Sequence, residues 1–458
     1  MSILIKGGIV VSDHQSQSID VRIEDSRIVE LGKHLPVLDS EMLDASSCYI
    51  LPGFIDGHTH LELNNGPGTD QVIDGFLSGT KAAISGGTTT VLDMATPTKG
   101  QSLKDCLTHW KQISEGLSHC DFSYHMAIIE WNASIQAEIT TMIHEGISSF
   151  KMYMAYLNLM SQDHELMEAL STIHKQGGNL VVHCENEEFI RECITTLARN
   201  HQLDMSYYPK SRPVIAEAEA VNRLLSIAEL IDAPIGIVHI SSKRAMDYVQ
   251  QARDRGLVVY AETCPHYLFL DEEVYERDNA YQYVCAPPIR SLSDKTAILQ
   301  ALKKGWIDTI STDQCAFSDA IKSKNIHDFR STPGGLPGIE HRAQLIYTYA
   351  VRAGLITIED MVALLSGNIA KQFQLYPRKG SIQVGADADL VIWDPTVERR
   401  IRASDQVMQV EYNPYEGILV YGQARYVYLR GKLVSTRGEV QQEASGKLLS
   451  RHVYPDIS

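Results

Sequence analysis

The 458-residue sequence predicts an α/β protein: a (β/α)8 barrel of the TIM type with a small β-sandwich domain built from both chain ends. Three observations predict this fold. Eight short apolar or β-branched runs alternate with helical stretches over roughly 250 residues, the size of a typical barrel. Both ends of the chain instead carry strand-and-turn patterns. Histidine, lysine and aspartate close several of the eight runs, where a barrel places its chemistry.

The eight runs are predicted strands because they are short, rich in β-branched residues and separated by segments with helical spacing of apolar residues. Residues 165–175 and 217–230 are examples of those helical segments. The alternative is a doubly wound sheet, but eight strand–helix units in this length favour the barrel. The predicted strands are 53–60, 88–95, 121–129, 148–154, 179–185, 234–240, 258–264 and 307–313.

The two ends of the chain have similar hairpin-like patterns. Because chain termini often lie close together, we expect one discontinuous β-sandwich domain of residues 1–50 and 378–458. Residues 51–377 then form the barrel. The predicted hairpins pair residues 3–5 with 9–11, 21–24 with 27–31, and 424–429 with 432–434.

Composition excludes several classes of function. The formal net charge is −16, with 57 acidic against 41 basic residues, which disfavours nucleic acid and anionic lipid as partners. The eight cysteines include no Cys-x-x-Cys pair, so we expect reduced thiols. The sequence shows neither a signal peptide at its start nor an apolar run of about 18 residues. These features predict a cytoplasmic enzyme that acts on a small molecule and does not bind a membrane.

Metal-ligand residue types gather at the ends of the predicted strands. His58 and His60 are two positions apart on one strand, so their side chains point to the same side. Each residue alone has an ordinary structural explanation, such as a core histidine, a helix N-cap aspartate or an edge lysine. Chance placement would scatter them over both ends of the barrel, so their joint position predicts a metal site. The candidate ligands are His58, His60, Lys151, His183, His239 and Asp313.

Lys151 requires a separate argument, because an ammonium group cannot bind a cation. Carbon dioxide can add to a neutral lysine amine to give a carbamate, whose two oxygens can bridge two metals about 3.5–4 Å apart. His58, His60 and Asp313 would then serve one metal, and His183 and His239 the other. A hydroxide between two cations is a nucleophile at neutral pH. These ligands suit zinc first, and also manganese, cobalt or nickel.

Short motifs along essentially the whole chain carry a family resemblance. In order, they are Pro52-Gly-Phe-Ile-Asp-Gly-His-Thr-His60, Gly86-Gly-Thr-Thr-Thr90, Ser149-Phe-Lys151, Met154-Ala-Tyr156, His183-Cys-Glu-Asn186, Glu262-Thr-Cys-Pro-His-Tyr-Leu268, Pro287-Pro288 with Arg290, Ser311-Thr-Asp313, Pro337-Gly-Ile-Glu340 and Gly385-Ala-Asp-Ala-Asp-Leu-Val391. In order and spacing they resemble the dihydropyrimidinase and D-hydantoinase family of cyclic amidohydrolases, including phenylhydantoinases, within the amidohydrolase superfamily.

The resemblance implies roles for the site residues. The six ligands would hold two divalent metals bridged by carboxylated Lys151. Asp313 would be the general base, and Tyr156 would hydrogen-bond the developing oxyanion. The main chain near Ala286 and Gly334 would hold the amide edge of the ring. The positions implied to line the substrate pocket are Leu63, Tyr153 and Met160.

Three positions depart from the family pattern. Gln314 replaces a histidine that usually follows the catalytic aspartate. Ala286 stands where serine is common, and Gly334 where asparagine is common. Main-chain contacts to the substrate would tolerate the last two changes, whereas side-chain contacts would not.

The implied reaction opens a ring amide of a 5-substituted hydantoin or dihydropyrimidine to give an N-carbamoyl amino acid. An allantoinase is the alternative enzyme, and a non-catalytic scaffold protein of the same family is the alternative class. All six ligand positions are intact, which disfavours the scaffold. Dihydroorotases carry an arginine where this chain has Glu62, so an acidic substrate is disfavoured. Relatives of this kind are commonly tetramers, which implies a homotetramer.

Overall fold

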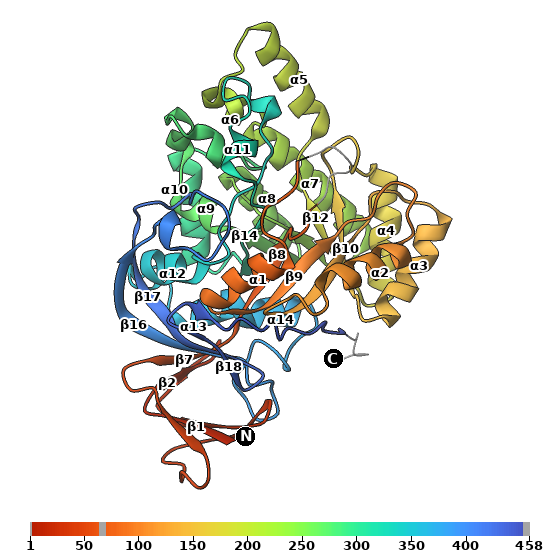
Figure 1. Ribbon diagram of the computed structural model, residues 1–458. Helices are drawn as coiled ribbons and strands as arrows, with labels where there is room; N and C mark the ends of the chain where they lie inside the picture. The colour runs from red at the N-terminus through yellow and green to blue at the C-terminus, as the bar shows by residue number, and fades with distance from the viewer. Residues whose placement is uncertain (1, 64–69, 452–458) are drawn as a thin grey trace.

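The structure, a computed structural model, describes residues 2–63 and 70–451. Eight parallel strands stand side by side in sequence order, from β8 to β15, and curve into a nearly closed barrel (Figure 1). Each of the eight predicted runs contains one of them, so the predicted barrel is confirmed. The strands are β8 (Phe54–Thr59), β9 (Thr88–Ala95), β10 (Asp121–Ala127), β11 (Ser149–Tyr153), β12 (Asn179–His183), β13 (Ile235–Ile237), β14 (Val259–Thr263) and β15 (Thr309–Ile310).

Helices follow the strands and surround the barrel (Figure 1). Polar residues begin several of them: the Ser102 hydroxyl accepts a hydrogen bond from the Asp105 N–H at the start of α2, and Ser242 does the same for α8. The segments predicted as helical from their spacing lie in α4 and α7. The helices are α1 (Phe76–Ser85), α2 (Leu103–Ser114), α3 (Ala133–His144), α4 (Asp163–Lys175), α5 (Glu187–Arg199), α6 (Tyr208–Ser211), α7 (Val214–Ile231), α8 (Lys243–Asp254), α9 (Pro265–Phe269), α10 (Leu292–Lys303), α11 (Asp319–Lys322), α12 (Arg342–Ile346), α13 (Ile358–Val362) and α14 (Asn368–Gln372).

Side chains join the first and last strands of the barrel. The buried Arg342 guanidinium donates to the Ile55 carbonyl of β8 at 2.8 Å and to the Ile310 carbonyl of β15 at 2.9 Å. On the same seam, the buried Asp56 carboxylate accepts hydrogen bonds from the Thr312 N–H and hydroxyl. These contacts hold the two edges together, and so bring the residues after β15 next to those of β8.

The two chain ends meet in a pair of further sheets, as predicted from their similar patterns. One sheet has the order β5-β4-β1-β6, and the other has the order β19-β18-β17-β16-β7-β2-β3, which mixes strands from both ends (Figure 1). Their division from the barrel at residues 50 and 378 remains a prediction. The strands are β1 (Ser2–Lys6), β2 (Ile9–Val11), β3 (Ser16–Gln17), β4 (Asp20–Glu24), β5 (Arg27–Gly32), β6 (Glu41–Asp44), β7 (Tyr49–Pro52), β16 (Leu390–Arg400), β17 (Leu419–Leu429), β18 (Lys432–Thr436) and β19 (Glu439–Val440).

Two of the three predicted hairpins are confirmed, and the first is wrong. β4 pairs with β5 and β17 pairs with β18, both antiparallel. β1 instead pairs with β4 and β6, whereas β2 pairs with β3 and β7. Ile3 and Ile5 of β1 and Val10 of β2 belong to one buried apolar cluster. The chain therefore crosses from one sheet to the other at Gly7, because packing face to face buries these side chains together.

Candidate metal centre

The six predicted ligands all lie at the carboxyl ends of barrel strands. His58 and Lys151 lie within the last three residues of β8 and β11, and His183 ends β12. His60, His239 and Asp313 follow the ends of β8, β13 and β15 within three residues. This is the face where barrels of this type carry their active sites.

The backbone is strained at three of the predicted site positions. Three of the predicted site residues have left-handed backbone conformations, with φ of 70° at Tyr156, 40° at His239 and 53° at Asp313. Such conformations cost a residue with a side chain about 1–3 kcal/mol and persist only where surrounding contacts impose them. The fold therefore tolerates strain to place these side chains.

His58, His60 and Asp313 form one compact cluster. The Nε2 atoms of the two imidazoles are 3.3 Å apart, and the Asp313 Oδ1 lies 3.2 Å from His58 Nε2 and 3.1 Å from His60 Nε2. One ligand atom from each residue lies within 4.8 Å of the others. Burial opposes the negative charge of Asp313, but His58 and His60, when they are protonated, hold its pKa well below the ordinary value.

The protonation of His58 shows that this cluster fits a cation. Its Nδ1 lies 2.8 Å from the Glu262 Oε1. Because a carboxylate only accepts hydrogen bonds, we assign the imidazole proton to Nδ1. The lone pair of His58 Nε2 then faces the carboxylate oxygen of Asp313, an arrangement of two acceptors that a metal ion would satisfy. A carboxylate behind a ligating histidine is the usual support of such a site.

His183 and His239 form a second pair, in which a carboxylate again supports one of the histidines. The His183 Nδ1 lies 2.9 Å from the His239 Nε2, and the His183 Nε2 lies 2.8 Å from the buried Glu185 carboxylate. We assign the His183 proton to Nε2, which leaves its Nδ1 lone pair facing His239. Burial opposes the charge of Glu185, but the Arg212 guanidinium, 2.5 Å away, lowers its pKa well below the ordinary value.

Lys151 is buried, with 1% of its surface exposed. Burial, opposed by the charges of Asp313 and Glu262, lowers the pKa of its amine to about 8. The pKa values of His60, His183 and His239 are lowered mainly by burial and in part by the charge of Lys151, which places its amine within electrostatic reach of both groups. Among the described residues, no carboxylate forms an ion pair with it.

Aromatic and apolar residues predicted to contact a substrate stand beside the histidines. The Tyr156 ring centroid is 5.0 Å from that of His183, and the Tyr153 ring centroid is 6.3 Å from both. Met160 forms a β-bridge with Tyr153 and is half-buried, as is Leu63. The ring and bridge contacts thus join Tyr153, Tyr156 and Met160 in one group beside His183, and Leu63 follows His60 by three residues.

The two predicted main-chain contacts are neighbours in space. A Cβ atom added to Gly334 would lie 3.9 Å from the Ala286 nitrogen, an ordinary contact distance. Ala286 is half-buried and Gly334 is exposed, so both can be reached from outside. Gln314 is buried, and its side-chain oxygen accepts hydrogen bonds from the N–H groups of Gly338 and Ile339. It therefore supports the neighbouring loop, a role that requires no proton transfer.

The structure corrects one part of the substrate argument. The Glu62 carboxylate accepts a hydrogen bond from the Phe76 N–H at 3.2 Å, at the start of α1. Its charge is therefore engaged with the helix terminus, and direct repulsion of an acidic substrate is no longer supported. The lack of an arginine at position 62 still disfavours a carboxylate there.

Sequence reasoning assigned no roles to Glu185, Glu262 and Arg212. Glu185 stands two residues after His183, and Glu262 lies within β14. One pattern in the sequence could have indicated them: a carboxylate at a predicted strand end, close to a candidate ligand histidine, is a typical support of a metal ligand.

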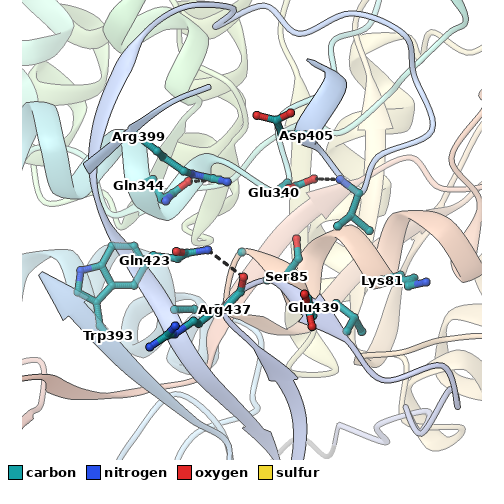
Figure 2. A pocket seen from close by; sticks show the side chains of 15 residues that line it. Lys81, Ser85, Glu340, Gln344, Trp393, Arg399, Asp405, Gln423, Arg437 and Glu439 are labelled. Atoms are coloured by element: carbon teal, nitrogen blue, oxygen red, sulfur yellow. Dashed lines mark hydrogen bonds between the residues drawn. The ribbon is translucent and has the colours of Figure 1, made fainter. Parts of the chain in front are cut away.

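A cavity of about 560 Å³ lies elsewhere, between α1, the start of α12 and the sheet of β16 and β17 (Figure 2). Glu340, Gln344, Trp393 and Arg399 are among its lining residues, and none of the predicted site residues is. The predicted site residues thus lie apart from this cavity, at the carboxyl ends of the barrel strands.

Fold and site together define the class: a (β/α)8-barrel protein with a candidate metal site at the carboxyl ends of its strands. The chain belongs to the amidohydrolase family, whose family model matches residues 49–434. It is 38% identical over 439 residues to a D-hydantoinase of Geobacillus stearothermophilus, covering 95% of this chain and 93% of the relative. A D-hydantoinase of Ralstonia pickettii is 35% identical, covering 99% and 100%. The crystal structure of dihydropyrimidinase from Brevibacillus agri NCHU1002 matches with a TM-score of 0.97 and 35% identity over all of both chains.

Proposed function

We propose that this chain hydrolyses one amide bond in the ring of a cyclic diamide, such as a 5-substituted hydantoin or a dihydropyrimidine. The product is an N-carbamoyl amino acid. The observation that carries the proposal is the convergence of His58, His60 and Asp313 at the mouth of a barrel that matches hydantoinases over its full length.

We further propose that the site holds two divalent cations, with zinc the first expectation. His58, His60 and Asp313 would hold one, His183 and His239 the other, and a carboxylated Lys151 would join them. Bound there, the cations would supply a nucleophile at neutral pH and polarise the ring carbonyl. The lone pairs assigned to His58 Nε2 and His183 Nδ1, which face Asp313 and His239, support this donor set.

Asp313 is the proposed general base. Its carboxylate takes a proton from the attacking water, whose oxygen bonds to the ring carbonyl carbon. The carbon–nitrogen bond of the ring then breaks, and Asp313 returns the proton to the leaving nitrogen. The low pKa of Asp313 keeps it ionised and able to accept the proton at neutral pH.

Substrate groups have candidate partners around the cluster. Tyr156 donates a hydrogen bond to the developing oxyanion, and the main chain at Ala286 and Gly334 holds the amide edge of the ring. The ring substituent would make apolar contacts with Leu63, Tyr153 and Met160. These contacts favour a substrate whose substituent is a hydrophobic group such as phenyl.

A substrate panel with metal analysis tests the proposal. The purified protein is assayed with 5-phenylhydantoin, hydantoin, dihydrouracil, allantoin and dihydroorotate, and ring opening is followed by loss of ultraviolet absorbance or by product chromatography. We expect the first three to be opened and dihydroorotate to be refused. Allantoin turned over faster than the others would support an allantoinase instead. A protein that binds no metal and opens no ring would support the scaffold alternative.

We also propose a cytoplasmic homotetramer. All eight cysteines are unpaired, as expected in a reducing compartment. Within residues 2–63 and 70–451, no helix has both the length and the apolar character needed to cross a membrane. The tetramer follows from the family resemblance, and light scattering coupled to size-exclusion chromatography measures it directly.

A further inference from the structure

Lys322 is a fully buried lysine that the proposed chemistry does not use. It ends the short helix α11, and its relative exposure is 0%. Its Nζ donates to three main-chain carbonyls, those of Gln282 at 3.1 Å, Val284 at 2.9 Å and Gly335 at 2.7 Å. Three acceptors match the three N–H groups of an ammonium ion.

This arrangement is costly for the fold. Among the described residues, no carboxylate forms an ion pair with Lys322, and burial lowers the pKa of its amine, whereas its three carbonyl acceptors favour the charged form. A buried cation without a counterion is retained only where its hydrogen bonds are well made. The contacts of Lys322 therefore fix a specific geometry of the segments they join.

The joined segments are those that carry the proposed main-chain contacts to the substrate. Val284 lies two residues before Ala286, and Gly335 directly follows Gly334. The Val284 carbonyl also accepts a hydrogen bond from the Gly335 N–H at 2.9 Å. Gly335 could not be replaced easily, because a Cβ atom there would lie 2.3 Å from the Cys315 carbonyl oxygen. Lys322 thus completes a closely packed junction between the two segments.

We propose that Lys322 is a positioning residue for the substrate: its ammonium group sets the spacing between the main chain at Ala286 and at Gly334, which hold the two sides of the ring amide edge. The inference rests on the proposed function. Lys322 does not touch the substrate, and it does not contribute to the metal ligands. Its loss should therefore weaken substrate binding and leave the chemical step and the metals in place.

The test compares Lys322→Met with Lys379→Met. Lys379 is a matched control, because it is also a buried lysine but pairs with Asp121 at 2.6 Å and Asp389 at 2.5 Å, away from the proposed site. With 5-phenylhydantoin, Lys322→Met should raise KM at least about tenfold and change kcat by less than about threefold, because binding is lost equally from ground and transition states. Metal content per chain should be unchanged. Lys379→Met should lower the melting temperature and leave KM within about twofold of the wild type.

An unchanged KM in Lys322→Met, with only a lower melting temperature as in the control, would overturn the inference. Should Lys322→Met not yield folded protein, Lys322→Gln is measured by the same KM criterion, since its shorter side chain cannot reach all three carbonyls. A wild-type enzyme that opens no cyclic amide would overturn the proposed function and this inference together. An active wild type with unchanged KM in the variants would overturn this inference alone.

Discussion

Carboxylation of Lys151 predicts how the metal-free protein takes up metal as the pH changes. Only a neutral amine adds carbon dioxide, so the rate should follow the neutral fraction of Lys151. With a pKa of about 8, this fraction is about 9% at pH 7, against about 0.03% for an ordinary lysine. Burial therefore makes the amine about 300-fold more available at neutral pH.

Between pH 7 and pH 8 the neutral fraction rises about fivefold. The histidine ligands should not contribute to this rise, because burial lowers the pKa values of His60, His183 and His239 and leaves them neutral throughout this range. The initial rate of metal uptake by the metal-free protein, at fixed dissolved carbon dioxide, should therefore rise about fivefold over one pH unit. Removal of carbon dioxide should slow it at every pH.

The assay mixes metal-free protein with zinc or manganese in buffers of constant dissolved carbon dioxide, and measures bound metal against time. Carbon-13-labelled carbon dioxide, followed by NMR, reports the carbamate itself. Lys151→Met is the control, and it should retain fewer than two metals per chain and show no labelled carbamate. Uptake that is independent of pH and of carbon dioxide, or two metals bound in Lys151→Met, would refute the carboxylated bridge.

Three further substitutions have expected outcomes. Tyr156→Phe should lower kcat about 100-fold with little change in KM, because one hydrogen-bond donor to the oxyanion is lost. Steady-state hydrolysis of 5-phenylhydantoin measures both constants, and an unchanged kcat would show that Tyr156 has no part in the mechanism. Glu185→Gln should weaken metal binding about 10- to 100-fold in competition with a chelator, since His183 loses its carboxylate support; unaltered affinity would contradict that role. Arg342→Met should lower the free energy of unfolding by about 3–5 kcal/mol in urea, because three buried hydrogen bonds are lost, two across the barrel seam and one to Thr88 of β9. A loss below about 1 kcal/mol would show that the seam closes without Arg342.

The sequence was sufficient for the barrel because its strands are local patterns. All residues of the run 88–95 except Asp93 are apolar or β-branched, and every residue of β9 is buried. The place of the candidate ligands at one end of the barrel was equally predictable, because a residue at a strand end is placed by the strand itself; their role as metal ligands stays a prediction. The pairing of the first hairpin was not predictable in this way, because the partners of β1 and β2 depend on which faces are buried by strands far along the chain.

Residues whose roles arise from long-range contacts escaped prediction for the same reason. Glu62 lies beside His60 in the sequence, yet its carboxylate belongs to the start of α1. Lys322 has no ligand-like motif around it, and only the folded chain brings Gln282, Val284 and Gly335 around its ammonium group. Such roles depend on distances that no local spacing encodes.

Three buried lysines differ in the groups that surround their amines, and therefore in the role that each amine can have. Lys379 has carboxylates on every side, from Asp121, Asp387 and Asp389, and so serves as a fixed cation between barrel and terminal strands. Lys151 is equally buried but, among the described residues, has no such partner, so its pKa falls to about 8 and its amine becomes nucleophilic. Lys322 also lacks a carboxylate partner among the described residues, yet its N–H groups donate to three main-chain carbonyls. The chemistry proposed for Lys151 thus follows from what surrounds its amine. It is desolvated like the amine of Lys322, but it lies within electrostatic reach of the predicted metal ligands and has no main-chain acceptors among the contacts of the described residues.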